Sequence, residues 1–354
     1  MLAMGVALVP RLAAQVQTEV PPVVPDAKPV TVEHIKVHSE AMEGNLEGEA
    51  VDRDVIVFLP PSYQKDKKRR YPVLYALHGF SIGAEQWSHE IHVPQTIEGA
   101  FATGSVEMIV VLPDSKTVYG GSMYSSSATT GDFERFVSHD VVAYIDAHYR
   151  TIPERMSRGL AGHSMGGYGA ARIGMKHPDV FSNLYIMSPC CLSPMGSRPP
   201  NPAMQKAMEE QEKALESVKT PADAAGLSFF AKAQLASAAA WSPDPKNPPL
   251  YLDLPRKGGE PQPEVIAKWT ANAPLAFADQ YIGNLRQYHA IAFDVGDQDG
   301  LRFDTIKLHD ILDKYGIANS FEIYHGTHTS AVADRFQNHV LPFFSRNLCS
   351  KNCQ

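Results

Sequence analysis

The chain has 354 residues, of which 44% are hydrophobic and 20% are charged, and its formal net charge is −7. This composition is globular and excludes the charge-rich, aromatic-poor sequence of a disordered chain. A negative net charge with one basic cluster, residues 65–70, excludes an extended nucleic-acid-binding surface. We expect that cluster to be a solvated turn between two strands.

The first 30 residues differ from the rest of the sequence. Residues 1–16 are mostly apolar but too short to span a bilayer, which takes about 20 residues. They resemble the hydrophobic region and small-residue cleavage zone of a secretory signal. Residues 21–29 are rich in proline. We therefore expect a signal-like segment and tether over 1–30 and a single domain over 31–354. The expected protein is secreted or periplasmic and has no membrane span.

From residue 31, short apolar runs alternate with helical patterns, which predicts a mostly parallel central sheet flanked by helices, an α/β fold. Several runs consist almost entirely of valine, isoleucine and leucine, as is typical of strands buried on both faces. The expected strands are 54–59, 73–77, 108–112, 158–162, 184–187, 291–295 and 321–324. The expected helices are 132–148, 166–176, 302–315 and 330–347.

Residues 197–287 interrupt this alternation. They contain two proline-rich passages and two helical segments, 203–218 and 229–240. We expect this segment, about 197–287, to be an insertion over the carboxyl edge of the sheet rather than a separate domain.

The motif Gly162-x-Ser164-x-Gly166 follows an apolar run and precedes a helical pattern rich in alanine and glycine. Strand, turn and helix in this order form the context of a nucleophile elbow. The serine of such a turn has a strained backbone, and the glycines avoid clashes with neighbouring backbone. The pattern therefore predicts Ser164 as a nucleophile at the start of a helix.

A serine hydroxyl is a weak nucleophile and needs a base that a third group orients. Two later segments each follow an expected strand and carry suitable side chains: Asp297 and Asp299 in one, His325 and His328 in the other. The carboxyl ends of parallel strands meet at one edge of a sheet, so both segments should lie near Ser164. We expect His328 to be the base, because His325 ends the strand, and we prefer Asp299 to Asp297 as the acid.

Acyl chemistry on a serine also needs hydrogen-bond donors for the oxyanion that develops. We expect one donor to be the backbone N–H of Met165, which follows the nucleophile. The other should be the backbone N–H of Phe80, in the loop after strand 73–77. Tyr124 and Trp241 are candidate substrate-binding residues, the former in a loop after an expected strand and the latter in the insertion. His89 and His92 have helical spacing but no accompanying ligand motif, so we expect no metal site.

The chain has four cysteines, Cys190, Cys191, Cys349 and Cys353. A bridge between the adjacent Cys190 and Cys191 would be strained. A link from one of them to the C-terminal pair, or a local bridge between Cys349 and Cys353, remains open from the sequence.

Four segments together resemble the putative-esterase family, which groups feruloyl and acetylxylan esterases, esterase D (S-formylglutathione hydrolase) and mycolyl-transferring relatives. They are Pro72–Gly79, Gly159–Ala170, Gly296–Asp299 and Gly326–His328. The resemblance covers about residues 31–345. It implies an α/β-hydrolase fold, no metal or organic cofactor, and a triad at Ser164, Asp299 and His328.

With this resemblance the expected activity is ester hydrolysis through an acyl-enzyme on Ser164. The substrate would be a small-molecule or polysaccharide-linked ester, such as a feruloyl or acetylxylan ester. Two alternatives remain: acyl transfer to a sugar or alcohol, and a non-catalytic carbohydrate- or envelope-binding protein. The ordered serine, aspartate and histidine disfavour the second, because a binding module needs no such set.

Overall fold

The computed structural model describes residues 16–194 and 202–350 and has an eight-stranded central sheet. The strand order is β1-β2-β4-β3-β7-β8-β11-β12. β1 and β2 pair antiparallel with each other, and β2 pairs antiparallel with β4, whereas all later neighbours are parallel. The strands are β1 (Thr31–His38), β2 (Asp52–Leu59), β3 (Val73–Leu77), β4 (Ile109–Pro113), β7 (Arg158–His163), β8 (Asn183–Met187), β11 (Ala290–Gly296) and β12 (Ser320–Tyr324).

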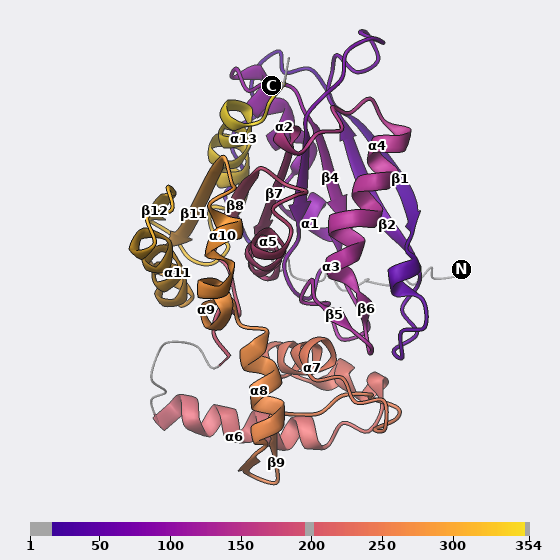
Figure 1. Cartoon of the computed structure of the whole chain (residues 1–354), viewed down its shortest axis with the longest axis vertical. Helices are drawn as coiled ribbons and strands as arrows, with labels where there is room; N and C mark the ends of the chain where they lie inside the picture. Colours follow the sequence, from indigo (N-terminus) through magenta and orange to yellow (C-terminus); the bar gives the residue numbers. More distant parts are fainter. Residues whose placement is uncertain (1–15, 195–201, 351–354) are drawn as a thin grey trace, which may run out of the picture.

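Helices cover both faces of this sheet (Figure 1). One face carries α3 (Phe133–Arg135), α4 (Val141–His148), α5 (Met165–Lys176) and α11 (Arg302–Lys314). The other carries α1 (Ala84–Glu90), α2 (Val93–Ala102), α12 (Val332–Arg335) and α13 (Leu341–Asn347). β3 is apolar at every position because both of its faces are buried. Val73, Tyr75 and Leu77 pack into one core, and Leu74 and Ala76 pack into the other.

The expected strands and crossover helices are confirmed, with ends shifted by a few residues. Two of the helices contain a π-helical turn, Phe136–Asp140 before α4 and Phe336–Val340 before α13. The elements that were not predicted include the edge strand β1 and the helices α1 and α2. β1 has the sequence TVEHIKVH and is mostly exposed, so it lacks the apolar run on which the prediction of strands depended.

Residues 16–30 differ from the expected free tether, because they lie against the folded domain. Val16 is buried, and its backbone N–H donates to Glu90 Oε2 at 2.7 Å. Further along, Gln95 Nε2 donates to the carbonyl of Pro21 at 2.7 Å, and Glu98 accepts from the backbone of Val30 at 3.0 Å. The expectation that the first 30 residues stay outside the fold is therefore wrong for 16–30. The signal-like residues 1–15 lie outside the described residues.

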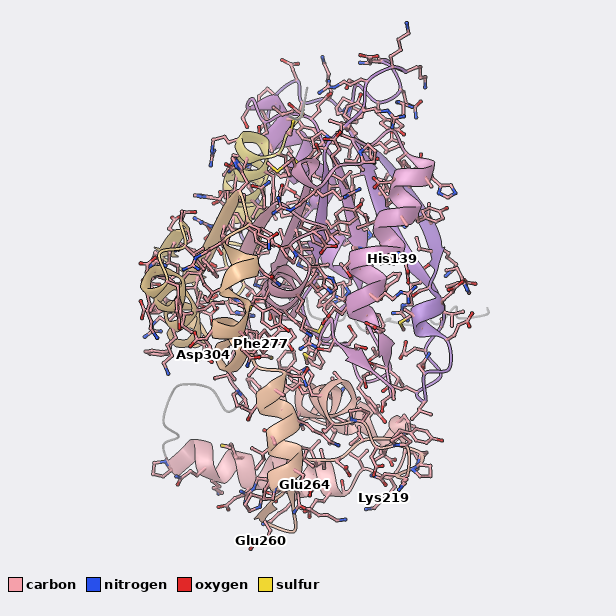
Figure 2. The ribbon with its side chains drawn as sticks, viewed as in Figure 1. His139, Lys219, Glu260, Glu264, Phe277 and Asp304 are labelled. Atoms are coloured by element: carbon pink, nitrogen blue, oxygen red, sulfur yellow. The ribbon has the colours of Figure 1, made fainter. Side chains whose placement is uncertain are left out.

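The described part of the insertion forms a group of helices at one end of the molecule, at the bottom of Figure 1. It contains α6 (Pro202–Glu216), α7 (Phe229–Trp241) and α8 (Pro263–Ala271), with a small hairpin of β9 (Arg256–Lys257) and β10 (Glu260–Pro261). Lys219, Glu260 and Glu264 mark the end of this group away from the sheet, as Figure 2 shows. The short helices α9 (Pro274–Phe277) and α10 (Ile282–Leu285) lead back to β11.

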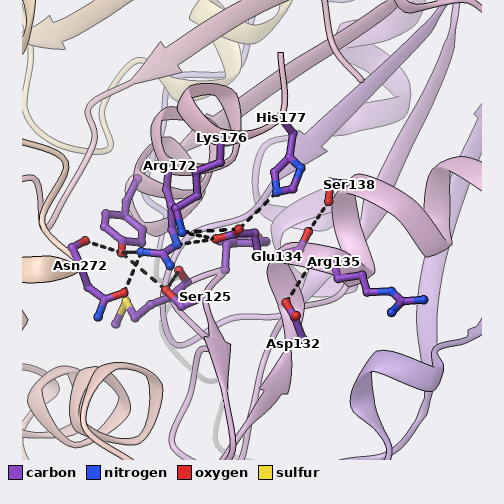
Figure 3. Close-up of polar contacts among 12 residues, drawn as sticks. Ser125, Asp132, Glu134, Arg135, Ser138, Arg172, Lys176, His177 and Asn272 are labelled. Atoms are coloured by element: carbon purple, nitrogen blue, oxygen red, sulfur yellow. Dashed lines mark hydrogen bonds and ion pairs between the residues drawn. The ribbon is translucent and has the colours of Figure 1, made fainter. Parts of the chain in front are cut away.

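A buried polar network joins this insertion to the sheet domain (Figure 3). Arg172 of α5 donates to Glu134 Oε2 at 2.8 Å and to Oδ1 of Asn272, just after α8, at 2.7 Å. Lys176 and His177 also contact Glu134, at 3.1 and 3.2 Å. Burial alone raises the pKa of Glu134, but the bond from His177 and the charges of Arg172 and Lys176 lower it to about 2. The carboxylate therefore stays ionised and orients Arg172, which connects α5 to the insertion at Asn272.

No helix in residues 16–194 and 202–350 combines the length and the apolar character that a membrane crossing requires.

Candidate active site

Ser164 lies between β7 and α5 in a sharp turn, with φ 60° and ψ −114°. Residues other than glycine rarely adopt this backbone conformation, so surrounding contacts must hold the turn in place. Two glycines allow those contacts. A Cβ on Gly162 would collide with the backbone of Gly166, and a Cβ on Gly166 would collide with the carbonyl of Leu77. The expected elbow geometry is thus present, and it brings the Ser164 hydroxyl to the N-terminus of α5.

Loops after β11 and β12 bring an aspartate and a histidine to this serine. His328 Nδ1 lies 2.7 Å from Asp299 Oδ2, and His328 Nε2 lies 2.9 Å from Ser164 Oγ. Because a carboxylate only accepts, Nδ1 carries the proton and Nε2 accepts from the serine hydroxyl. The structure therefore brings together the three residues expected from the sequence in one hydrogen-bonded chain.

Asp299 is 3% exposed and also accepts from the backbone N–H of Leu301 at 2.9 Å. Burial on its own raises the pKa of this carboxyl. The bond and charge of His328, with the Leu301 N–H, outweigh burial and bring the pKa below its ordinary value. Asp299 is therefore ionised at neutral pH and can hold the His328 ring in one tautomer.

Asp297 and His325 are close in sequence to this pair but form a separate one. His325 Nδ1 lies 3.0 Å from Asp297 Oδ2, and both side chains are exposed, at 84% and 46%. Asp297 also accepts from the backbone N–H of Gly326 at 3.0 Å. This pair connects the loop after β11 to the loop after β12 and does not contact Ser164.

Two buried histidines beside the site were not identified from the sequence. His163, the residue before Ser164, directs Nε2 to the backbone carbonyl of His328 at 2.9 Å. His78 accepts from the backbone N–H of Ser115 at Nε2, so its Nδ1 carries the proton and donates to the Gly79 carbonyl; both distances are 2.8 Å. Burial lowers the pKa of both imidazoles, to about 3 for His163. Both are therefore neutral, and each fixes a loop that flanks Ser164.

The two residues whose backbone N–H groups were expected to bind the oxyanion lie close to Ser164. Met165 is the first residue of α5, and Phe80 follows Gly79, where an added Cβ would stand 3.5 Å from the Ser164 Cβ. Within the described ranges neither amide donates to a protein acceptor. Two backbone N–H groups are thus available on either side of the serine.

The two candidate substrate-binding residues are buried. Tyr124 is fully buried, and its hydroxyl donates to the carbonyl of His78, in the loop that leads to Phe80, at 3.1 Å. The expectation that Tyr124 lines a pocket is therefore corrected: it supports the Phe80 loop from below. Trp241 is 6% exposed, packs against Tyr168 and Trp269, and donates to Ser125 Oγ at 3.1 Å. Trp241 joins the insertion to the core, and its contact with substrate stays a prediction.

The structure answers part of the question of disulfide pairing, which the sequence left open. Cys349 is disulfide-bonded, whereas Cys190 and Cys191 are free thiols. A link between this adjacent pair and the C-terminal cysteines is therefore absent from the described structure. Cys353 lies outside the described residues.

A mostly parallel sheet that carries a serine on an elbow, followed in chain order by an aspartate and a histidine, is the α/β-hydrolase fold. Solved structures share it over nearly the whole chain. A ferulic acid esterase superposes with a TM-score of 0.63 at 24% identity, covering 91% of this chain and 100% of that one. An S-formylglutathione hydrolase from Staphylococcus aureus has a TM-score of 0.57 at 16% identity, covering 90% and 98%.

A family model described as "Putative esterase" matches residues 50–338, and the chain belongs to this family. Among curated relatives, an endo-1,4-beta-xylanase/feruloyl esterase of Xylanibacter ruminicola is 28% identical over 37% of this chain and 19% of its own length. An esterase of Mycobacterium tuberculosis, Rv1288, is 31% identical over 36% of this chain and 27% of its own length. These matches span less than a third of each relative.

Proposed function

We propose that the protein is a serine carboxylic-ester hydrolase that works through an acyl-enzyme on Ser164. The observation that carries this proposal is the hydrogen-bonded chain from Asp299 through His328 to Ser164, at 2.7 and 2.9 Å. A structural hydrogen-bond network would not need a strained serine backbone. Membership in the putative-esterase family supports the same chemistry.

In the proposed reaction, Ser164 Oγ attacks the ester carbonyl while His328 Nε2 takes its proton. Asp299 stabilises the imidazolium that forms, and the tetrahedral intermediate collapses as His328 gives the proton to the leaving alcohol. A water molecule, deprotonated by His328, then attacks the acyl-enzyme, and His328 returns the proton to Ser164 Oγ as the free acid leaves. The carboxylate of Asp299 remains ionised throughout, consistent with its lowered pKa.

The oxyanion would be held by the backbone N–H groups of Met165 and Phe80. Each such donor contributes roughly 3–4 kcal/mol to lowering the barrier. The partial positive charge at the N-terminus of α5 acts at the same position. His78 supports the second donor, because its bonds to Gly79 and Ser115 fix the loop that ends at Phe80.

We propose an ester of an aromatic acid, such as a feruloyl ester, as the substrate. Phe229 and Phe230 of α7 are 46% and 70% exposed. Phe229 packs edge-on against Phe80, with ring centroids 5.4 Å apart, so the aromatic surface begins at the proposed oxyanion loop. A planar aromatic acyl group can stack there. The similarity to the Xylanibacter endo-1,4-beta-xylanase/feruloyl esterase supports the same class of substrate.

The test is hydrolysis by purified protein and by Ser164→Ala. We expect the wild type to hydrolyse methyl ferulate faster than p-nitrophenyl acetate, p-nitrophenyl butyrate or S-formylglutathione. The variant should lose turnover and fluorophosphonate labelling while its melting temperature stays unchanged. Retained turnover in the variant would refute the assignment of Ser164. A competing alcohol or sugar acceptor separates hydrolysis, which gives mainly free acid, from acyl transfer.

We also propose that the protein is secreted, on the basis of the signal-like residues 1–16. Val16 already packs against the folded domain, so removal of a signal should leave the chain from about that residue onward. N-terminal sequencing of protein recovered from the medium or periplasm checks this. An intact Met1 on protein retained in the cytoplasm would contradict it.

A further inference from the structure

The adjacent residues Cys190 and Cys191 follow β8 in the loop that borders Ser164. Backbone bonds fix this loop: Ser188 donates to the carbonyl of Asp294 at 2.8 Å, and Cys190 donates to the carbonyl of Ser164 at 3.1 Å. Both thiols are half-buried, and the reaction proposed above uses neither of them. A pair of thiols without an assigned role is therefore placed directly against the elbow.

The backbone brings the two thiols together. In extended chain, successive side chains point to opposite faces, which would keep adjacent sulfur atoms apart. Cys191 instead has φ +61°, a conformation that residues with a side chain seldom adopt. Its Sγ lies 2.6 Å from Sγ of Cys190, closer than the van der Waals contact of two non-bonded sulfur atoms and only slightly longer than a disulfide bond. The turn therefore holds the sulfur atoms in position to react with each other.

We propose that Cys190 and Cys191 are a modification site that closes into a vicinal disulfide, with a low-molecular-weight disulfide as the oxidant. One thiolate attacks the oxidant and forms a mixed disulfide, releasing one thiol. The second cysteine then attacks the protein sulfur of that mixed disulfide and releases the second thiol. The two cysteines lose two protons and two electrons, and the oxidant is reduced to two thiols.

Closing this ring has a consequence for the neighbouring serine. A mixed disulfide or an alkyl group on either thiol adds bulk beside Ser164, whereas an internal disulfide caps both thiols and adds none. The ring also removes the side-chain freedom of the residue whose N–H binds the Ser164 carbonyl. We therefore expect the oxidised pair to protect the site against thiol-directed reagents.

The test is mass spectrometry of the purified full chain after incubation with oxidised glutathione and alkylation. We expect the peptide that contains both cysteines to be lighter by two hydrogen atoms than its reduced form and to carry no alkyl group. Cys190→Ser and Cys191→Ser should each carry a glutathione adduct on the remaining thiol. Wild type that carries adducts, stays fully alkylatable or forms covalent dimers through these residues would overturn the proposal.

A second experiment measures the rate of ester hydrolysis. The mass measurement above does not depend on whether the protein hydrolyses esters. Iodoacetamide should inactivate the reduced wild type and leave the oxidised wild type active. Cys190→Ala combined with Cys191→Ala should be insensitive to the reagent in either state. Equal loss of activity in both redox states of the wild type would contradict the protective role.

Discussion

The rings of His163 and His328 lie against each other with centroids 4.9 Å apart, and His163 donates from Nε2 to the backbone carbonyl of His328. His163 is neutral, because burial first and the neighbouring His328 second lower its pKa to about 3. A neutral donor can hold the His328 loop without opposing the positive charge that His328 gains during the proposed reaction. His163 is thus a positioning residue for the proposed base.

Replacing His163 tests this role. His163→Ala should lower kcat roughly tenfold and leave KM nearly unchanged, because it removes a single buried hydrogen bond that orients the His328 loop. His163→Gln, which can still donate from its amide, should recover most of the loss. Steady-state kinetics with melting curves measures both. An equal loss in the two variants, or a loss that follows stability, would contradict a positioning role.

The two neighbouring aspartates give a matched pair of variants. Asp299→Asn should lower kcat roughly 10³–10⁴-fold, because the amide N–H can donate to Nδ1 and favour the wrong His328 tautomer, and a neutral amide cannot stabilise the imidazolium. Asp297→Asn should stay within about twofold of the wild type, since its partner His325 is exposed. Kinetics on one ester distinguishes them. A large loss in the Asp297 variant alone would reverse the assignment of the acid.

Thr18 connects the N-terminal segment to the loop after His328. Its Oγ1 donates to the carbonyl of Ser330 at 3.2 Å and accepts from the N–H of Ala333 at 3.1 Å, and Glu19 N–H reaches the same Ser330 carbonyl at 2.8 Å. Thr18→Val keeps the shape but removes the bonds of the hydroxyl to Ser330 and Ala333. We expect kcat to fall several-fold, with Thr18→Ser close to wild type. Unchanged kinetics in Thr18→Val would show that this contact does not position His328.

Glu47 provides a prediction about pH. Within the described residues, both of its carboxyl oxygens are buried without a hydrogen-bond partner. Burial first and the charge of Glu49 second raise its pKa from 4.5 to about 9. Between these values the folded protein binds a proton that the unfolded chain releases, so this group makes stability fall as pH rises.

Glu47→Gln removes this titration while keeping the shape of the side chain. We expect the variant to exceed the wild type in free energy of unfolding by at least about 1 kcal/mol at pH 8, and by less at pH 5. Urea unfolding at the two pH values measures the difference. An equal gain in the free energy of unfolding at pH 5 and pH 8 would show that Glu47 does not titrate between these pH values.

The central sheet and the elbow could be predicted from the sequence because both have local signatures. A strand buried on both faces must be apolar throughout, as in Val73–Leu77, and the elbow needs glycines at Gly162 and Gly166 for close backbone contacts. β1 could not be predicted in this way. It is a mostly exposed edge strand whose pairing with β2 depends on residues about 20 positions away.

The side-chain partners needed the tertiary structure. The roles of His163 and His78 follow from contacts with His328 and Ser115, residues that are distant in sequence. For Tyr124 the sequence was misleading. Its position after a strand suggested a substrate-binding role, whereas its side chain is buried in the folded protein. Likewise, a proline-rich composition did not reveal that residues 16–30 pack on α1 and α2.

The sequence by itself determined the fold class, the elbow serine and the chain order of serine, aspartate and histidine, because local patterns of burial, turn and spacing encode them. The sequence also favoured Asp299 over Asp297 and His328 over His325, but only the tertiary structure showed that this pair meets Ser164 and which neighbours hold it. Residues two or three positions apart in one loop have nearly the same sequence context. Their hydrogen-bond partners depend on the direction in which the folded loop turns each side chain.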